Sequence, residues 1–121
     1  MGIVYTEGVT KRGMSLRQFV DVTSTNAARI FGLYPRKGVI AVGSDADLTL
    51  MDTRQKRRLT MADFHVADYS PWEGWEISGW PTTTILRGRV LTQNGTLRAQ
   101  PGFGQWLHRK IDPQILQRPA V

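Results

Sequence analysis

Apolar residues near the start of the chain recur at the spacing expected of an α-helix. Leu16 and Phe19 follow Ser15, and Ser15 forms a capping-box signature with Gln18 three residues later. This pattern predicts a first helix over residues 15–22.

A second short helix is predicted to begin at Thr25 or Asn26, either of which can cap its first turn. Gly32 can adopt the left-handed conformation that ends a helix, and Pro35 prevents the helix from continuing. Its apolar positions are Ala28, Ile30 and Phe31. Each helix has one apolar face, which indicates that it packs on another element.

After Gly38 the pattern changes to that of β-strands. Apolar and β-branched residues predict strands at 39–42 and 48–51, with a turn at 43–45 between them. The basic run at 54–58 is interpreted as a solvated turn between two strands.

A second β region is predicted by two turn signals. Residues 82–86 and 89–92 flank Arg87-Gly88, and Asn94-Gly95 is a strong hairpin signal that returns the chain into residues 96–98. From residue 101 onward, glycine and proline interrupt any period, which predicts an extended tail with at most a short helix at 105–110.

These elements predict an α+β fold: two short N-terminal helices, a small antiparallel β-sandwich-like unit and an extended C-terminal tail. We expect a helical segment at 1–36, a small β domain at 37–100 and a tail at 101–121. A chain of 121 residues is too short for a (β/α)8 barrel of roughly 250 residues. One domain is therefore expected.

Composition narrows the class of protein. The chain is 40% hydrophobic, and no apolar run approaches the ~20 residues of a membrane span, so no membrane association is expected. It has no cysteine, which excludes disulfides and thiolate metal sites. We find no secretory signal at the N-terminus and expect a cytoplasmic location.

The net charge of +6 raises the question of nucleic-acid binding. The charge is spread along the sequence except at residues 54–58, and no aromatic or helical recognition signature accompanies that run. Nucleic acid is therefore not favoured as a partner.

Candidate metal ligands are few. The imidazoles are His65, which could pair with Asp68 but is more simply a surface residue, and His108, which is expected to be solvated. Asp45 and Asp47 are the best carboxylate pair, with Asp52 beyond, but the glycine and terminal glutamate of a calcium loop are missing. We expect Asp45 to fold back on its own backbone and Asp47 to begin a strand.

The remaining candidates also have simpler structural explanations. The serines lack a nucleophile-elbow context and are expected to be caps or turn residues: Ser24, Ser44, Ser70 and Ser78. Residues 102–104 and 74–79 do not match a phosphate loop. Four aromatic residues lie close in sequence, and packing against a core or a partner subunit is favoured over base or cofactor stacking. They are Tyr69, Trp72, Trp75 and Trp80.

Three stretches carry a family resemblance: TSTNAARIFGLYPRKG at 23–38, GSDADLTLMD at 43–52 and DYSPWEGWEISGWP at 68–81. In this order they resemble the C-terminal portion of the dihydropyrimidinase and D-hydantoinase branch of the cyclic amidohydrolases. The loop at 68–74 is more specific to that branch than the turn at 43–47. The resemblance extends from residue 5 to residue 110.

The resemblance implies a TIM-barrel hydrolase in which two divalent metal ions, usually zinc, activate water against a ring amide. The family ligands are an early His-x-His pair, a carboxylated lysine, two later histidines and an aspartate, and none of these motifs occurs in this chain. Residues 15–33 then correspond to the last helices around the barrel, and 39–97 to most of the sandwich beside it. The stretch 103–109 is similar to the family's subunit-contacting extension.

Three functions follow from these patterns. The chain is a fragment of a cyclic amidohydrolase that is inactive alone, with no catalytic residue, cofactor or metal site of its own; or a structural and oligomerisation module; or, less favoured, a basic nucleic-acid binder. The expected partners are the missing barrel portion or further copies of the chain. These contacts are expected through an edge strand, an exchanged tail, or the helix faces that carry Leu16, Phe19, Val20, Ile30 and Phe31.

Overall fold

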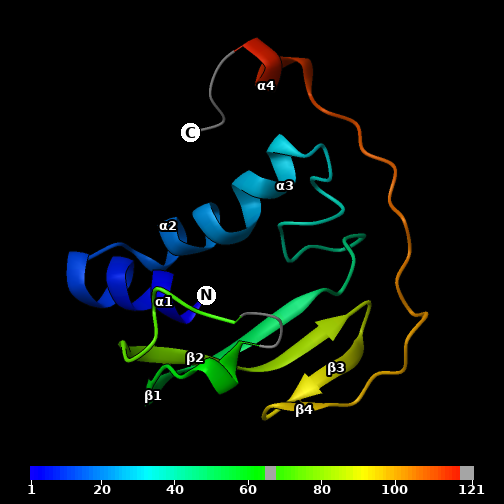
Figure 1. The fold of residues 1–121 in the computed structure, drawn as a ribbon. Helices are drawn as coiled ribbons and strands as arrows, with labels where there is room; N and C mark the ends of the chain where they lie inside the picture. The colour runs from blue at the N-terminus through cyan, green and yellow to red at the C-terminus, as the bar shows by residue number, and fades with distance from the viewer. Residues whose placement is uncertain (65–67, 118–121) are drawn as a thin grey trace.

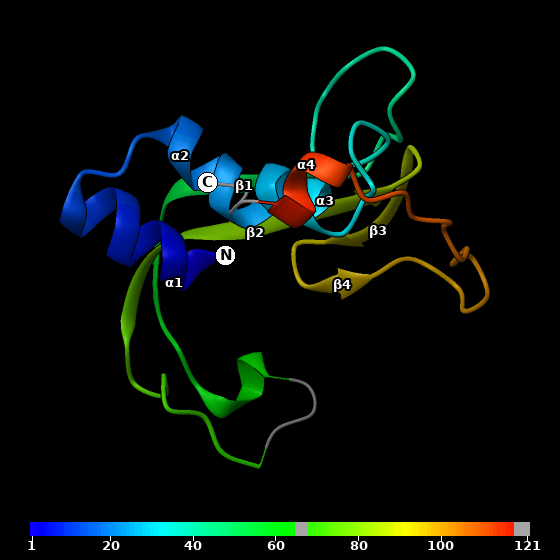
Figure 2. The ribbon, with the colours of Figure 1, turned by 90° about the horizontal axis from the view of Figure 1, so that it is seen from above.

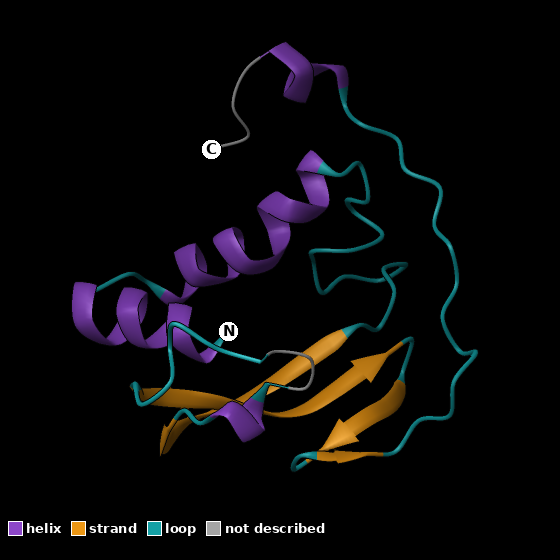
Figure 3. Ribbon diagram, in the orientation of Figure 1, coloured by secondary structure: helices purple, strands orange, loops and turns teal. Residues whose placement is uncertain are grey.

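The computed structural model places helices on one side of an antiparallel sheet, and a long tail connects the sheet back to the helices (Figure 1). The structure describes residues 1–64 and 68–117. Figure 3 separates the helical layer from the strand layer, which confirms the predicted α+β class. No helix in the described part of the chain is long and apolar enough to cross a bilayer.

The predicted pair of helices is one continuous helical segment. It comprises α2 (Leu16–Val20), the π-helical turn η2 (Asp21–Thr25) and α3 (Asn26–Ile30). α3 begins at Asn26 with Thr25 at its N-cap position, as predicted, but the Thr25 hydroxyl does not cap the first turn, because it donates to the Gly38 carbonyl at 2.9 Å.

Both predicted ends of this segment are confirmed. Ser15 accepts from the Gln18 amide, and the Gln18 side chain accepts from the Ser15 amide, which completes the capping box. Gly32 ends the segment with φ of +69°, where a Cβ would lie 2.5 Å from the carbonyl carbon of Lys110. A larger residue at this position would therefore displace the tail as well as strain the backbone.

A further helical segment precedes the predicted ones. It begins with α1 (Gly2–Val4) and continues as the π-helical stretch η1 (Tyr5–Thr10). The Tyr5 ring meets Phe19 edge-on at a centroid distance of 5.5 Å, which packs the two helical segments together.

The β unit is a single four-stranded sheet in the order β1-β2-β3-β4. The strands are β1 (Leu48–Arg58), β2 (Glu76–Leu86), β3 (Arg89–Gln93) and β4 (Thr96–Leu97). Both turn predictions are confirmed: Arg87-Gly88 and Asn94-Gly95 have positive φ at both positions and connect adjacent antiparallel strands.

Two predictions about the strands are wrong. Residues 39–42 form an exposed loop, because nothing packs on Ile40 and Val42, which are 87% and 108% exposed. The basic run at 54–58 is no turn but lies in β1, where residues 56–58 pair with residues 76–78 of β2. Strand β2 begins earlier than the predicted residues 82–86 and includes the stretch 76–81, and its register with β1 shifts beside Pro81.

The helices attach to the sheet through close backbone contact. Residues 53–55 of β1 lie opposite Gly79 alone, so the ladder is broken beside Ser78. The buried Thr6 hydroxyl accepts from the Ser78 amide at 2.8 Å and reaches the Ser78 and Gly2 carbonyls at 2.9 and 2.8 Å. Thr6 thus joins the first helical segment to the backbone of β2 at Ser78.

The tail crosses from β4 back to the end of α3 (Figure 1). The Arg87 side chain donates to the Phe103 carbonyl, and the guanidinium lies 4.4 Å from the Phe103 ring centroid. The Lys110 amide donates to the Gly32 carbonyl at 2.8 Å. The helix predicted at 105–110 is absent there; the tail stays extended and forms α4 (Pro113–Gln117) beyond it, with proline in the first turn.

Figure 2 shows that the 3-10 turn η3 (Met61–Asp63), which follows β1, lies away from the helices. Arg57, near the end of β1, pairs with Asp63 of η3. Its guanidinium also lies over the Trp80 ring, 4.0 Å from the ring centroid.

Candidate functional site

The carboxylates of Asp45 and Asp47 converge on one lysine. Lys37 Nζ lies 2.8 Å from Asp45 and also bonds Asp47, and Arg36 reaches Asp45 at 3.0 Å. The expectation that Asp45 folds back on its own backbone is therefore wrong, since its side chain pairs with cations instead. The site that a cation would need is filled by the Lys37 ammonium.

This pairing changes the protonation of both partners. Hydrogen bonds from Lys37 and then Arg36 hold the pKa of Asp45 below its usual value of 3.8. Desolvation disfavours the charged form of Lys37, but its hydrogen bonds to Asp45 and Asp47 outweigh that effect and raise its pKa. Both groups stay charged near neutral pH.

Asp47 also connects the loop to the sheet. Its carboxylate accepts from the Arg87 amide at 2.8 Å, and the Gly88 amide donates to the Ala46 carbonyl at 2.9 Å. The strand begins one residue later, at Leu48. The cluster of Lys37, Asp45 and Asp47 is therefore a structural junction between the helical segment and the β2–β3 turn.

The other predicted metal candidates are not brought together. Asp52 pairs with Arg54, whose backbone and side chain both donate to it, and these hydrogen bonds lower the pKa of Asp52. His108 is exposed, and its ring centroid lies 4.2 Å from that of Trp106. His65 lies outside the described residues. Within residues 1–64 and 68–117, no group of three or more potential ligands is placed to hold a metal ion.

The serine and tryptophan candidates occupy separate places. Ser44 donates to the Pro35 carbonyl and Ser70 accepts from the Trp72 amide, as expected of turn residues. Ser78 lies within β2 instead. Trp72 and Trp75 lie at the surface in the loop before β2, whereas Trp80 lies in the sheet beneath Arg57.

The described surface contains a wide groove between α2 and β1. It has a volume of about 610 Å3 and is lined mainly by apolar atoms, including Leu16, Val20 and Met51. Leu16 is 61% exposed and Val20 is 49% exposed, while Ile30 and Phe31 lie exposed further along the helical segment. Phe19 is the exception among the five apolar residues predicted to form a contact surface, since it is buried against Tyr5.

Comparison with known proteins identifies this architecture. The amidohydrolase family profile matches residues 3–91. The chain is 41% identical over 110 residues to the D-hydantoinase of Geobacillus stearothermophilus, a match that covers 90% of this chain and 23% of that protein. It is 40% identical over 111 residues to a D-phenylhydantoinase of Escherichia coli O1:K1, covering 91% of this chain and 24% of that one.

Solved structures agree with the sequence match. The D-hydantoinase of Bacillus sp. AR9 superposes with a TM-score of 0.86 at 43% identity, covering 91% of this chain and 24% of that chain. The D-hydantoinase of Thermus sp. gives a TM-score of 0.84 at 42% identity, with 89% and 24% coverage. This chain belongs to the amidohydrolase family, and the resemblance to the D-hydantoinase and dihydropyrimidinase branch is confirmed. It spans about a quarter of the length of the relatives it matches.

Proposed function

We propose that this chain is the C-terminal module of a cyclic amidohydrolase that hydrolyses ring amide C–N bonds, and that the chain alone is not catalytic. The observation that supports this proposal most strongly is the TM-score of 0.86 to a D-hydantoinase over 91% of this chain. The module keeps the fold of that quarter closely enough to pack against the remaining three quarters.

The residues of this chain do not fit the metal site that the family implies. Within residues 1–64 and 68–117, potential ligands do not gather in threes, and the best carboxylate pair already binds Lys37. We therefore derive no catalytic step from these residues. The hydrolytic centre is assigned to the part of the family fold that this chain does not span.

The role that remains for the module is to cover and position the barrel. Leu16 and Val20 expose apolar surface into the groove beside β1, and burial of such surface contributes about 25 cal/mol per Å2. The same exposed surface also supports the second candidate function, a non-catalytic oligomerisation module.

Complementation tests the proposal. The chain is mixed with the Geobacillus stearothermophilus D-hydantoinase truncated by the quarter that matches, and hydantoin hydrolysis is measured with and without a chelator. We expect chelator-sensitive hydrolysis in the mixture that neither part shows alone. Val20→Asp should abolish the gain because it places a charge in the apolar groove, whereas Arg54→Gln, 91% exposed and outside that groove, should not.

If the mixture stays inactive while the chain sediments as a homo-oligomer, the oligomerisation function replaces the proposal. If Arg54→Gln abolishes the gain as fully as Val20→Asp, the groove is not the contact surface.

A further inference from the structure

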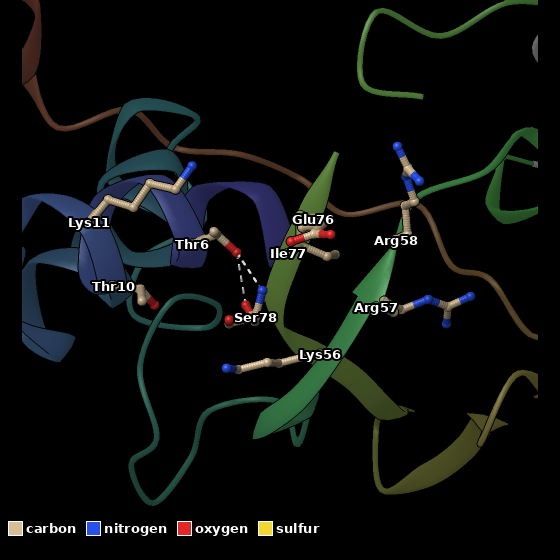
Figure 4. Close-up of a pocket in the computed structure, with 9 residues that line it drawn as sticks. All are labelled: Thr6, Thr10, Lys11, Lys56, Arg57, Arg58, Glu76, Ile77 and Ser78. Carbon is tan, nitrogen blue, oxygen red and sulfur yellow. Dashed lines mark hydrogen bonds between the residues drawn. The ribbon is translucent and has the colours of Figure 1, made fainter. Parts of the chain in front are cut away.

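A second pocket lies where η1 faces the C-terminal half of β1 (Figure 4). Its volume is about 490 Å3, within the range of small-molecule sites. Residues from both elements and from β2 line it, among them Thr6, Thr10, Lys11, Lys56 and Ser78. The register shift between Asp52 and Lys56 lies next to this pocket along β1.

The lining is basic. Lys56 extends from β1 toward the helical side of the pocket, whereas Arg57 and Arg58 extend away from it (Figure 4). Lys56 forms no ion pair with any residue in the described part of the chain. Its ammonium is therefore available to an anion from solution.

The other cations of the lining differ from Lys56. Arg57 pairs with Asp63, and Arg58 donates to the Gly74 carbonyl at 3.0 Å. Lys11 and Arg12 both form ion pairs with Glu7, so the positive charge of Lys11 is already partly neutralised. Glu76 is the acidic residue of the lining and lies opposite Arg58 in the sheet.

The floor of the pocket is rigid and polar. The buried Thr6 hydroxyl bonds the Ser78 backbone on both its amide and carbonyl sides, which fixes η1 against β2. Thr10, one helical turn later, exposes its hydroxyl at the pocket. A hydroxyl donor beside a free ammonium suits a multiply charged oxyanion.

We propose that this pocket binds the phosphate group of a small molecule, with Lys56 as the principal charge and Thr10 as a further donor. A phosphate group offers three acceptor oxygens and a charge of about −1.5 to −2 to donors that come from two elements, whereas a carboxylate offers two oxygens and a single charge. This inference is independent of the hydrolytic function proposed above.

The test is titration of the 121-residue chain with inorganic phosphate, followed by amide chemical shifts at constant ionic strength set with sodium chloride. We expect saturable shifts at Thr10, Lys11, Lys56 and Ser78. Lys56→Gln should weaken the apparent Kd about tenfold, the effect typical of losing one charged hydrogen bond. Lys56→Arg should retain binding within a few-fold.

Arg54→Gln is the matched control, since it removes the same charge from the same strand outside the pocket. It should leave the Kd unchanged. Equal weakening by Lys56→Gln and Arg54→Gln would show diffuse attraction and overturn the proposal, as would shifts that do not saturate. Acetate that binds as tightly as phosphate would contradict the assignment to phosphate.

Discussion

Single polar side chains connect the parts of this fold where backbone ladders stop. The Thr6 hydroxyl bonds the Ser78 amide and carbonyl, and Asp47 accepts from the Arg87 amide at the β2–β3 turn. Lys37 joins Asp45 and Asp47 to the loop after α3. These residues are close in space but separated along the sequence, so no local sequence pattern predicts their pairing.

Acid should weaken the junction through Asp45. Because the folded-state pKa of Asp45 lies below its ordinary 3.8, its contribution to stability is present above that value and is lost as pH falls through the folded pKa. Urea unfolding between neutral pH and about pH 3 should show that the stability difference between the native chain and Asp45→Asn shrinks on acidification. A difference that stays constant over this range would contradict the assigned pairing.

The elements predicted from sequence divide by whether their signal is local. The Ser15 capping box, the stop at Gly32 and both Gly-containing hairpin turns are local, and all are confirmed. The strand at 39–42 was predicted wrongly because apolar, β-branched character was taken for burial that the fold does not supply. The basic run was misplaced because its pairing with β2 is a long-range contact.

The same limit applies to the candidate sites. Sequence identified Asp45 and Asp47 as the best carboxylate pair, but not Lys37 between them. Neither pocket could be predicted, because each forms where a helical segment meets β1, and that contact has no signature in local sequence.

The contact between the first helical segment and β2 requires glycine at position 79 for two reasons, the backbone conformation and the lack of space for a Cβ. Gly95, in the β3–β4 turn, shares only the first of them. Gly79 has φ of +83°, and a Cβ there would lie 2.7 Å from the Tyr5 ring. Gly95 has a similar φ of +77° with open space around it. Gly95→Ala should lower the free energy of unfolding by about 1 kcal/mol through backbone strain alone. Gly79→Ala should lower the free energy of unfolding by about 1–3 kcal/mol more than Gly95→Ala does, because the added Cβ overpacks against Tyr5. Urea unfolding measures both, and equal losses would contradict the packing described.

At the scale of the whole molecule, the exposed apolar side chains need a partner. Leu16, Val20, Ile30 and Phe31 are each at least 45% exposed, and the free edge of β1 lies beside the groove. We expect further copies of the chain to cover this surface in the isolated protein. The division into segments 1–36, 37–100 and 101–121 remains a prediction at this scale.

We therefore expect the isolated chain to self-associate. Sedimentation equilibrium at micromolar concentration should give a mass above the 13.6 kDa of one chain. Leu16→Lys should shift the population toward monomer, because it places a charge on the contact surface. A native chain that sediments as a monomer and unfolds cooperatively would contradict this expectation.

The central claim is that this chain is an amidohydrolase module whose own residues do not carry the hydrolytic chemistry. The most direct test is turnover of hydantoin and dihydrouracil by the purified 121-residue chain, with the bound zinc quantified in the same sample. The account predicts no hydrolysis and no stoichiometric zinc. Turnover that survives repurification and disappears with a chelator would contradict it.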